Sequence, residues 1–480
     1  MTVHVHSMPA EPTRDDAVEV VRTMSDLSAT SSPPSGTVSS LLDGPIVPAM
    51  LRLGLPTLVV LLVQTLVGVA ETYFVSFLGT EALAGVGLVF PVLMLMQMMA
   101  NGGIGGGVAA AVARALGAGR RDDAEALLLH TLVLGLVFGL SFTLLALAGG
   151  PWLYRTLGGE NGSFVAALTY SNAIFLSATP LWVTALLSAA LRGAGDVKVP
   201  ALIIFAGAVV LVPLSPALIF GWGPFRGLGI GGAGAAVGIY YTAAAVGLIA
   251  YLRSSRATVR LVGTRLDFRL IRDIMGVGGL SSIGAVQANL TVALVTGAVG
   301  FYGAEAIAGY STAARLDYLL IPLLFGFGTA VVTMVGANVG AGRSLRARRV
   351  AWTGAVIGGG AAGLIGIVAA LFPRLWLGLF TNDDAVLAAG ALYLRTVAPF
   401  YSLFGAGFML YFASQGAGRV LLPVLGGTAR LLIAGVAGWL ASFWLSISLA
   451  GLFAIVATSA ALFGLICIAA VRSKAWGTPL

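Results

Sequence analysis

The sequence predicts an all-α integral membrane protein with twelve transmembrane helices, six in each half of the chain. Three observations lead to this fold class: an apolar composition, apolar stretches long enough to cross a bilayer, and an internal repeat. Apolar residues make up 58% of the 480 residues and charged residues 10%, whereas soluble domains have about 45–50% and about 25%. Water alone would not keep such a chain in solution.

Apolar stretches of about 20 residues or more recur along the chain, and each could cross a hydrocarbon core of roughly 30 Å as a helix. The expected spans are 54–78, 82–113, 126–149, 164–191, 199–220 and 232–252 in the first half, and 276–300, 306–337, 350–372, 387–413, 420–444 and 447–471 in the second. The second and eighth spans exceed the bilayer thickness, which implies tilt or extension beyond it.

The two halves of the chain repeat each other. Residues 77–85 read FLGTEALAG, and residues 301–309 read FYGAEAIAG. The Gly-Ala-Gly-Arg sequence of 117–120 returns at 340–343. Halves related by an axis along the membrane normal are a common way to build alternating access, so the repeat indicates a transporter.

The repeat and the charge pattern together define the expected domain organisation. Residues 1–42 are polar, rich in Ser and Pro, and lack the apolar run of a signal peptide, so we expect a disordered cytoplasmic leader. The remaining segments are an N-terminal six-helix lobe at 43–252, a basic cytoplasmic inter-lobe linker at 253–275, a C-terminal six-helix lobe at 276–474 and a cytoplasmic tail at 475–480.

The positive net charge of +8 reflects membrane orientation and not nucleic-acid binding. Most basic residues map to loops on one side of the predicted spans, and only Arg155, Arg226 and Arg374 map to the other. Cytoplasmic loops carry an excess of Lys and Arg, so both termini are expected in the cytoplasm. We expect a monomer in the cell (inner) membrane, surrounded by lipid.

Few residues could support enzyme chemistry. The chain has one cysteine, Cys467, and three histidines, His4, His6 and His130. A disulfide framework, a metal site and a His-based catalytic cluster are therefore not expected. The glycine runs at 101–107 and 227–234 lack the strand-turn-helix setting and the Lys-Ser/Thr ending of a nucleotide loop, and they favour close helix contacts instead.

Two acids, Glu71 and Asp317, fall inside predicted spans and are the candidates for ion coupling. An unpaired charge at bilayer depth costs about 2.5–3.5 kcal/mol, so an acid kept there normally faces a cavity, a partner or an ion route. A buried carboxyl can exchange a proton or bind Na⁺ as access alternates. The alternatives are a packing role for Glu71, and a salt bridge from Asp317 to Arg315 or Arg395.

Further polar or adaptable side chains in the spans are candidates for the cavity or the substrate site. They are Gln287, Asn289, Arg315, Arg395, Arg430, Ser215 and Met96. The alternatives are interhelical hydrogen bonds for the amides, withdrawal of the arginine charges toward an interface, and core packing for the methionine.

Three segments carry a family resemblance: Gly68–Ala84 (GVAETYFVSFLGTEALA), Leu191–Lys198 (LRGAGDVK), and Leu218–Gly223 (LIFGWG) leading into Gly232–Ala236. Over about residues 44–474 the chain resembles the multidrug and toxic compound extrusion (MATE) family of antiporters. The resemblance implies two six-helix lobes around a central cavity. It also implies export of cationic or amphipathic organic compounds in exchange for H⁺ or Na⁺, without another cofactor.

Glu71 stands where the family pattern usually has Asp, so the resemblance gives it the cation-binding role. The chain departs from the family in the fifth span, where many proton-linked members carry Asn-x-x-x-Asp-Pro and this chain has Leu211-Val-Pro-Leu-Ser215-Pro216. Two other functions compete with drug export. A lipid-linked oligosaccharide flippase or organic-anion exporter is favoured by the internal arginines, which suit a pyrophosphate, whereas a membrane-embedded enzyme would need a catalytic cluster that the sequence does not supply.

Overall fold

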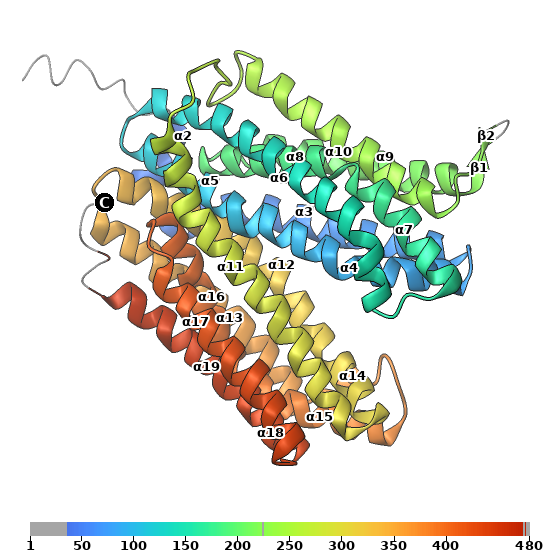
Figure 1. The fold of residues 1–480 in the computed structure, drawn as a ribbon. Helices are drawn as coiled ribbons and strands as arrows, with labels where there is room; N and C mark the ends of the chain where they lie inside the picture. The colour runs from blue at the N-terminus through green and yellow to red at the C-terminus, as the bar shows by residue number, and fades with distance from the viewer. Residues whose placement is uncertain (1–35, 223–224, 474–475, 477–480) are drawn as a thin grey trace, which may run out of the picture.

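A computed structural model describes residues 36–222, 225–473 and 476. Figure 1 shows two groups of helices, blue to light green for the first half of the chain and yellow to red for the second. The groups meet at one end, near α2 and α5, and diverge toward the other, where the β1–β2 hairpin and α14 lie.

The first half consists of helices that follow one another through short turns. They are α2 (Gly36–Asp43), α3 (Ile46–Ser76), α4 (Thr80–Met98), the π-helical turn η1 (Met99–Ile104), α5 (Gly105–Gly117), α6 (Arg121–Thr156), α7 (Asn161–Phe175), α8 (Ala178–Gly193), α9 (Lys198–Phe220) and α10 (Ile230–Arg253). Between α9 and α10, β1 (Gly221–Trp222) pairs antiparallel with β2 (Phe225–Arg226).

The second half repeats this order without the hairpin. Its elements are α11 (Phe268–Val299), η2 (Gly300–Tyr302), α12 (Ala304–Gly340), α13 (Ser344–Leu371), α14 (Pro373–Leu377), α15 (Asp384–Val397), η3 (Ala398–Phe400), α16 (Tyr401–Gly416), α17 (Leu421–Arg430), η4 (Leu431–Ala437), α18 (Gly438–Trp444) and α19 (Leu449–Arg472).

Eleven helices in the described residues are long and apolar enough to cross a membrane, and the bent pair of α7 and α8 makes a twelfth span. The predicted all-α membrane fold with twelve spans is confirmed. The fourth span bends by 48° between α7 and α8. Pro180 lies in the first turn of α8 and cannot donate to the carbonyl of Leu176, so the helix cannot continue unbroken there.

The internal repeat is also a repeat of backbone geometry. Gly79 precedes α4 with φ 103°, and Gly303 precedes α12 with φ 101°, a conformation that favours glycine. One and a half turns later, Gly85 packs against Ala167 and Gly309 packs against Gly390, so closely that an added Cβ would lie 2.7 Å from the backbone nitrogen of either partner. The matching sequences therefore form matching helix contacts.

Two long helices pass from one half of the molecule into the other. Met50 and Leu53, near the start of α3, belong to the hydrophobic core of the second half, whereas Val60 packs with α9 and α10 of the first. Conversely, Ile274 near the start of α11 belongs to the core of the first half, and Val295 near its end to that of the second. These two helices therefore tie the halves together where the groups meet.

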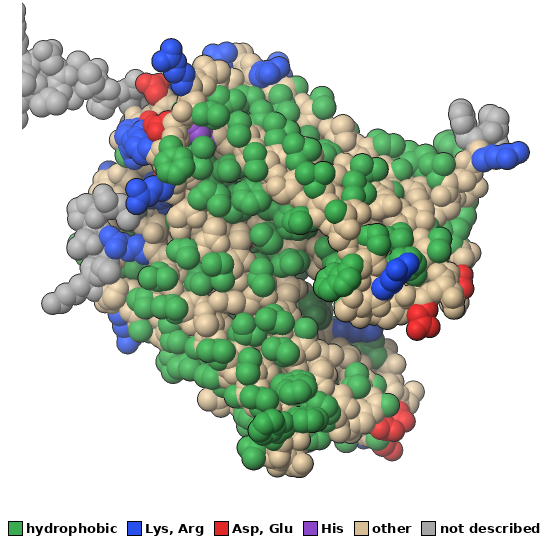
Figure 2. All heavy atoms as spheres, in the orientation of Figure 1, with side chains coloured by type: hydrophobic (Ala, Val, Ile, Leu, Met, Phe, Trp, Pro, Cys, Tyr) green, Lys and Arg blue, Asp and Glu red, His purple; other side chains and the backbone are tan. Residues whose placement is uncertain are grey.

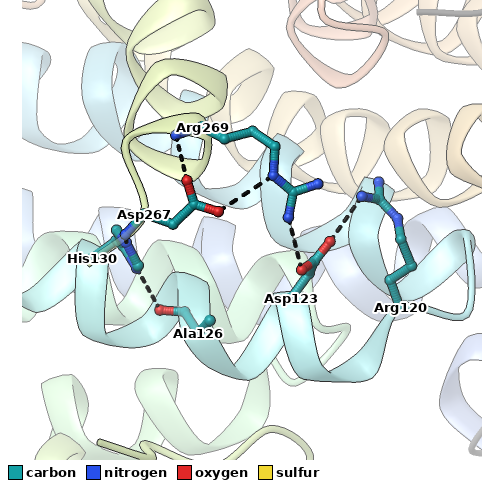
Figure 3. A network of polar contacts seen from close by, with 6 residues as sticks. All are labelled: Arg120, Asp123, Ala126, His130, Asp267 and Arg269. Atoms are coloured by element: carbon teal, nitrogen blue, oxygen red, sulfur yellow. Dashed lines mark hydrogen bonds and ion pairs between the residues drawn. The ribbon is translucent and has the colours of Figure 1, made fainter. Parts of the chain in front are cut away.

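The segment between α10 and α11 is fastened to α6 by polar contacts (Figure 3). The backbone N–H of Asp267 donates to Nε2 of the buried His130 over 2.8 Å, and Nδ1 of His130 lies 2.8 Å from the carbonyl of Ala126. Arg269 bridges the Asp267 carboxylate to Asp123, at 3.0 Å from the latter. These contacts fix the start of α11 on the first half.

Candidate functional site

A cleft separates the two halves on the side where they diverge. Figure 2 shows this hollow between the helices that end at the β1–β2 hairpin and those that end near α14. Lys and Arg side chains gather instead at the opposite end, where the halves meet (Figure 2). We call this the arginine-rich end; its turns and the adjoining first turns of α6 and α13 carry Arg120, Arg121, Arg343, Arg346 and Arg348.

Close backbone contacts between the halves close the arginine-rich end. A Cβ on Gly117 would collide with the carbonyl oxygen of Ala337, and one on Gly340 with that of Arg114. The side chain of Arg114 is buried and donates 2.6 Å to Asp273 and 3.2 Å to the carbonyl of Gly416, both in the second half. The cleft is therefore open at one end of the molecule and sealed at the other.

Glu71 lies near the C-terminal end of α3, which packs against α9 and α10. Gln64 and Val67 precede it by two turns and one turn, so all three share one helix face. Val67 contacts the small core formed by α3, α9 and α10. The Oε1 atom of Glu71 is buried and has no hydrogen-bond partner among the described residues. A buried carboxyl oxygen without a partner is the arrangement expected of an ion or proton site.

Three tyrosines surround Glu71 within electrostatic range: Tyr170 of α7, and Tyr240 and Tyr241 of α10. Ser215 is fully buried on α9, one turn beyond Leu211 of the same small core, and its hydroxyl has no partner in the described chain. The helices around Glu71 therefore supply a carboxyl and several hydroxyls, which are oxygen groups suited to H⁺ or Na⁺.

Asp317, on α12, has different surroundings. Tyr393 donates to Oδ2 over 2.7 Å, and Tyr401 donates to Oδ1. Arg430 lies within electrostatic range of Asp317, and its guanidinium lies 5.0 Å from the centre of the Phe404 ring. Its Nε is buried and has no partner among the described residues. The structure thus brings Asp317 and Arg430 together but joins the carboxylate to tyrosines.

The remaining arginines lie elsewhere in the second half. Arg315 is exposed and lies 5.3 Å from the centre of the Phe380 ring. Arg395 is exposed and lines a surface hollow together with Arg374 and Asp384. Neither forms an ion pair with Asp317 in the described residues, so the salt-bridge alternative for this carboxylate is wrong.

The amide and methionine candidates make structural contacts. Gln287 donates to Thr428 over 2.8 Å, as expected for interhelical bonding. Asn289 donates to the carbonyl of Ala285 over 2.9 Å and lies 3.2 Å from the sulfur of Met98, so it touches both halves. Met96 is fully buried in the core of the first half, where it packs and does not line the cleft.

Sequence reasoning missed Gln64 and the tyrosines. Gln64 carried a usable signal, since it is a polar residue in an apolar span seven positions before Glu71 and therefore on its face. Tyr170 and Tyr393 occupy matching positions of the repeat, three residues after Ala167 and Gly390 respectively. Each half therefore places an equivalent tyrosine near its half-buried acid. No group of three His, Cys, Asp or Glu that could hold a metal occurs in the described ranges.

Known proteins resemble the chain along most of its length. The MatE family model matches residues 56–217 and 282–440. The chain is 27% identical over 371 residues to an FAD transporter of Shewanella oneidensis, covering 76% of this chain and 81% of the relative. It is 26% identical over 383 residues to a probable multidrug resistance protein NorM of Thermotoga maritima, covering 78% and 81%.

Solved structures show the same fold. An outward-facing MATE-family multidrug resistance transporter of the MOP superfamily superposes with a TM-score of 0.82 at 24% identity, covering 92% of this chain and 100% of that one. A MOP superfamily transporter from Pyrococcus furiosus superposes with a TM-score of 0.83 at the same identity. With the family model spanning both halves, the chain belongs to the MatE family of multi-pass membrane transporters.

Proposed function

We propose that this protein is a secondary active exporter that exchanges H⁺ or Na⁺ for cationic or amphipathic organic compounds by alternating access. The observation that carries the proposal is the buried, unpartnered Oε1 of Glu71 at the junction of α3, α9 and α10. A carboxyl in this position can take up an ion from one side and release it to the other. Multidrug resistance relatives support the substrate class.

The orientation follows from charge. The arginine-rich end faces the cytoplasm under the positive-inside rule, which also places both termini there. The cleft then opens away from the cytoplasm, as in the outward-facing relative. In this state substrate leaves and the coupling ion enters.

Transport by reconstituted protein tests the proposal. In proteoliposomes with an imposed H⁺ or Na⁺ gradient, Glu71→Gln should reduce gradient-driven dye export to background, because it removes the charge and keeps the shape. Glu71→Asp should retain partial activity. Glu305→Gln, which neutralises an exposed acid in the first turn of α12, is the matched control and should transport normally. Wild-type export by Glu71→Gln would refute the coupling role.

Export of an organic anion is the second candidate function. Two observations favour it: Arg430 has a buried Nε without a partner in the described chain, and one relative is an FAD transporter. Dyes of matched size and opposite charge separate the two functions in the same vesicles. We expect the cationic dye to be preferred, because Arg430 stacks on Phe404 and its charge is offset by Asp317 within electrostatic range. Preferential export of the anionic dye would establish the second function.

A further inference from the structure

We propose that the arginine-rich end holds a binding site for the phosphate headgroup of an anionic phospholipid. The site is an open surface hollow of about 560 Å³ where the start of α3 meets the first turns of α13. It is lined by Ile46 of α3 and by Leu345, Arg348, Arg349, Trp352 and Thr353 of α13.

The arginines at this hollow have no acidic partners in the part of the chain that the structure describes. Arg348, Arg349 and Arg472 take part in none of the ion pairs found within 36–222, 225–473 and 476. Arg348 donates 2.9 Å to the carbonyl of Ser473, and its Nε is buried without a partner. The guanidinium of Arg472 lies 5.5 Å from the centre of the Trp352 ring. Two arginines therefore line the hollow, and the charge of a third lies beside its Trp352.

Guanidinium groups suit phosphate, because their planar N–H forks match its oxygens in pairs. A headgroup with net negative charge also gains from the summed field of the three arginines. A zwitterionic choline headgroup would bring an ammonium toward the same charges. The site therefore favours an anionic phosphodiester.

The apolar surroundings favour a lipid over a soluble phosphate. Leu345 is 75% exposed, and Val356, one turn beyond Trp352 on the same helix, is 73% exposed. Leu55 is 46% exposed on α3, which packs against α13. Arg348 and Arg349 lie within about 8 Å of the start of α13, and Trp352 lies about 12 Å from it. A tryptophan close to a helix end is typical of a membrane interface. The acyl chains would lie along α3 and α13, on the side of the arginines that faces the centre of the membrane.

Lipid retention by the purified full-length protein tests the proposal. Native mass spectrometry would compare binding of phosphatidylglycerol and phosphatidylcholine with the same acyl chains. The wild type should prefer phosphatidylglycerol. Arg348→Gln/Arg349→Gln should weaken that binding about 30-fold, equivalent to about 2 kcal/mol for two interfacial arginines. The control Arg260→Gln/Arg265→Gln removes two exposed linker arginines and should keep the wild-type affinity.

Two results would overturn the site. One is unchanged phosphatidylglycerol binding in the double variant. The other is displacement of the lipid by an equal concentration of glycerol phosphate, which would identify a soluble phosphate ligand. Since Arg348 also holds Ser473, the single variant Arg349→Gln serves if the double variant does not fold. It should weaken binding about fivefold, and unchanged binding would reject the proposal without reference to transport.

Discussion

Two half-buried carboxyls in the membrane-spanning helices have opposite hydrogen-bond environments. Oε1 of Glu71 has no hydrogen-bond partner among the described residues and lies within electrostatic range of Tyr240, whereas both oxygens of Asp317 accept hydrogen bonds from tyrosines. A group without fixed partners can exchange an ion at lower cost than one whose partners must be displaced. Under the proposed function, this difference favours Glu71 as the primary coupling residue and leaves Asp317, within electrostatic range of Arg430, as a second candidate.

Asp317→Asn tests that second role. Asparagine keeps the shape, and because a tyrosine hydroxyl can donate or accept, both contacts to Tyr393 and Tyr401 can persist. We therefore expect normal amounts of folded protein in the membrane and reduced gradient-driven transport. Fluorescence-detected size-exclusion and vesicle transport measure the two quantities. The exposed Asp384→Asn is the control, and loss of folded protein in Asp317→Asn would show that the carboxylate is structural.

At the scale of the elements, closely packed glycines decide how tightly the halves meet. Gly117 of α5 and Gly340 of α12 are matching positions of the repeat, and each lies against backbone of the other half. Their contacts are reciprocal, as expected for elements related by a pseudo-two-fold axis. The glycines therefore set the seal at the arginine-rich end of the molecule.

Gly340→Ala should weaken that seal. The new Cβ would collide with the backbone of Arg114, and overpacking of this kind costs typically about 1–3 kcal/mol. Spin labels at Ala118 and Leu345, with the buried Cys467 replaced by Ser, should report a larger fraction of long distances across this end. Gly360→Ala is the matched control, because nothing lies within 4 Å of its added Cβ. Identical distance distributions would contradict the prediction.

At the scale of the whole molecule, the structure is a cleft open at one end and held shut at the other. Arg114 of the first half connects to Asp273 and Gly416 in the second. The first turns of α3 pack in the core of the second half, and those of α11 pack in the core of the first half. Opening the sealed end must therefore separate these turns from those cores. The proposed alternating access therefore requires these contacts to break together.

Asp273→Asn should raise the population open at the arginine-rich end. Hydrogen bonds to charged groups contribute about 1.5–3 kcal/mol, which corresponds to a shift of roughly 10- to 100-fold in the equilibrium between the two states. The same pair of spin labels measures the shift. Asp122→Asn, which neutralises an exposed acid at the start of α6, should leave the distribution unchanged. An unaltered distribution in Asp273→Asn would show that backbone packing alone holds the seal.

The membrane class, the twelve spans and the repeat could be predicted from the amino-acid sequence, which also marks Glu71 as a candidate coupling residue. These properties depend on local composition and on the cost of a charge in lipid, both of which can be read along the chain. Only the packing of the helices reveals the tyrosine partners of Asp317 and the surroundings of Glu71. It also reveals that α3 and α11 cross from one half into the other. These features join side chains from separate helices, and an apolar span carries too little pattern to tell which of its faces meets which neighbour.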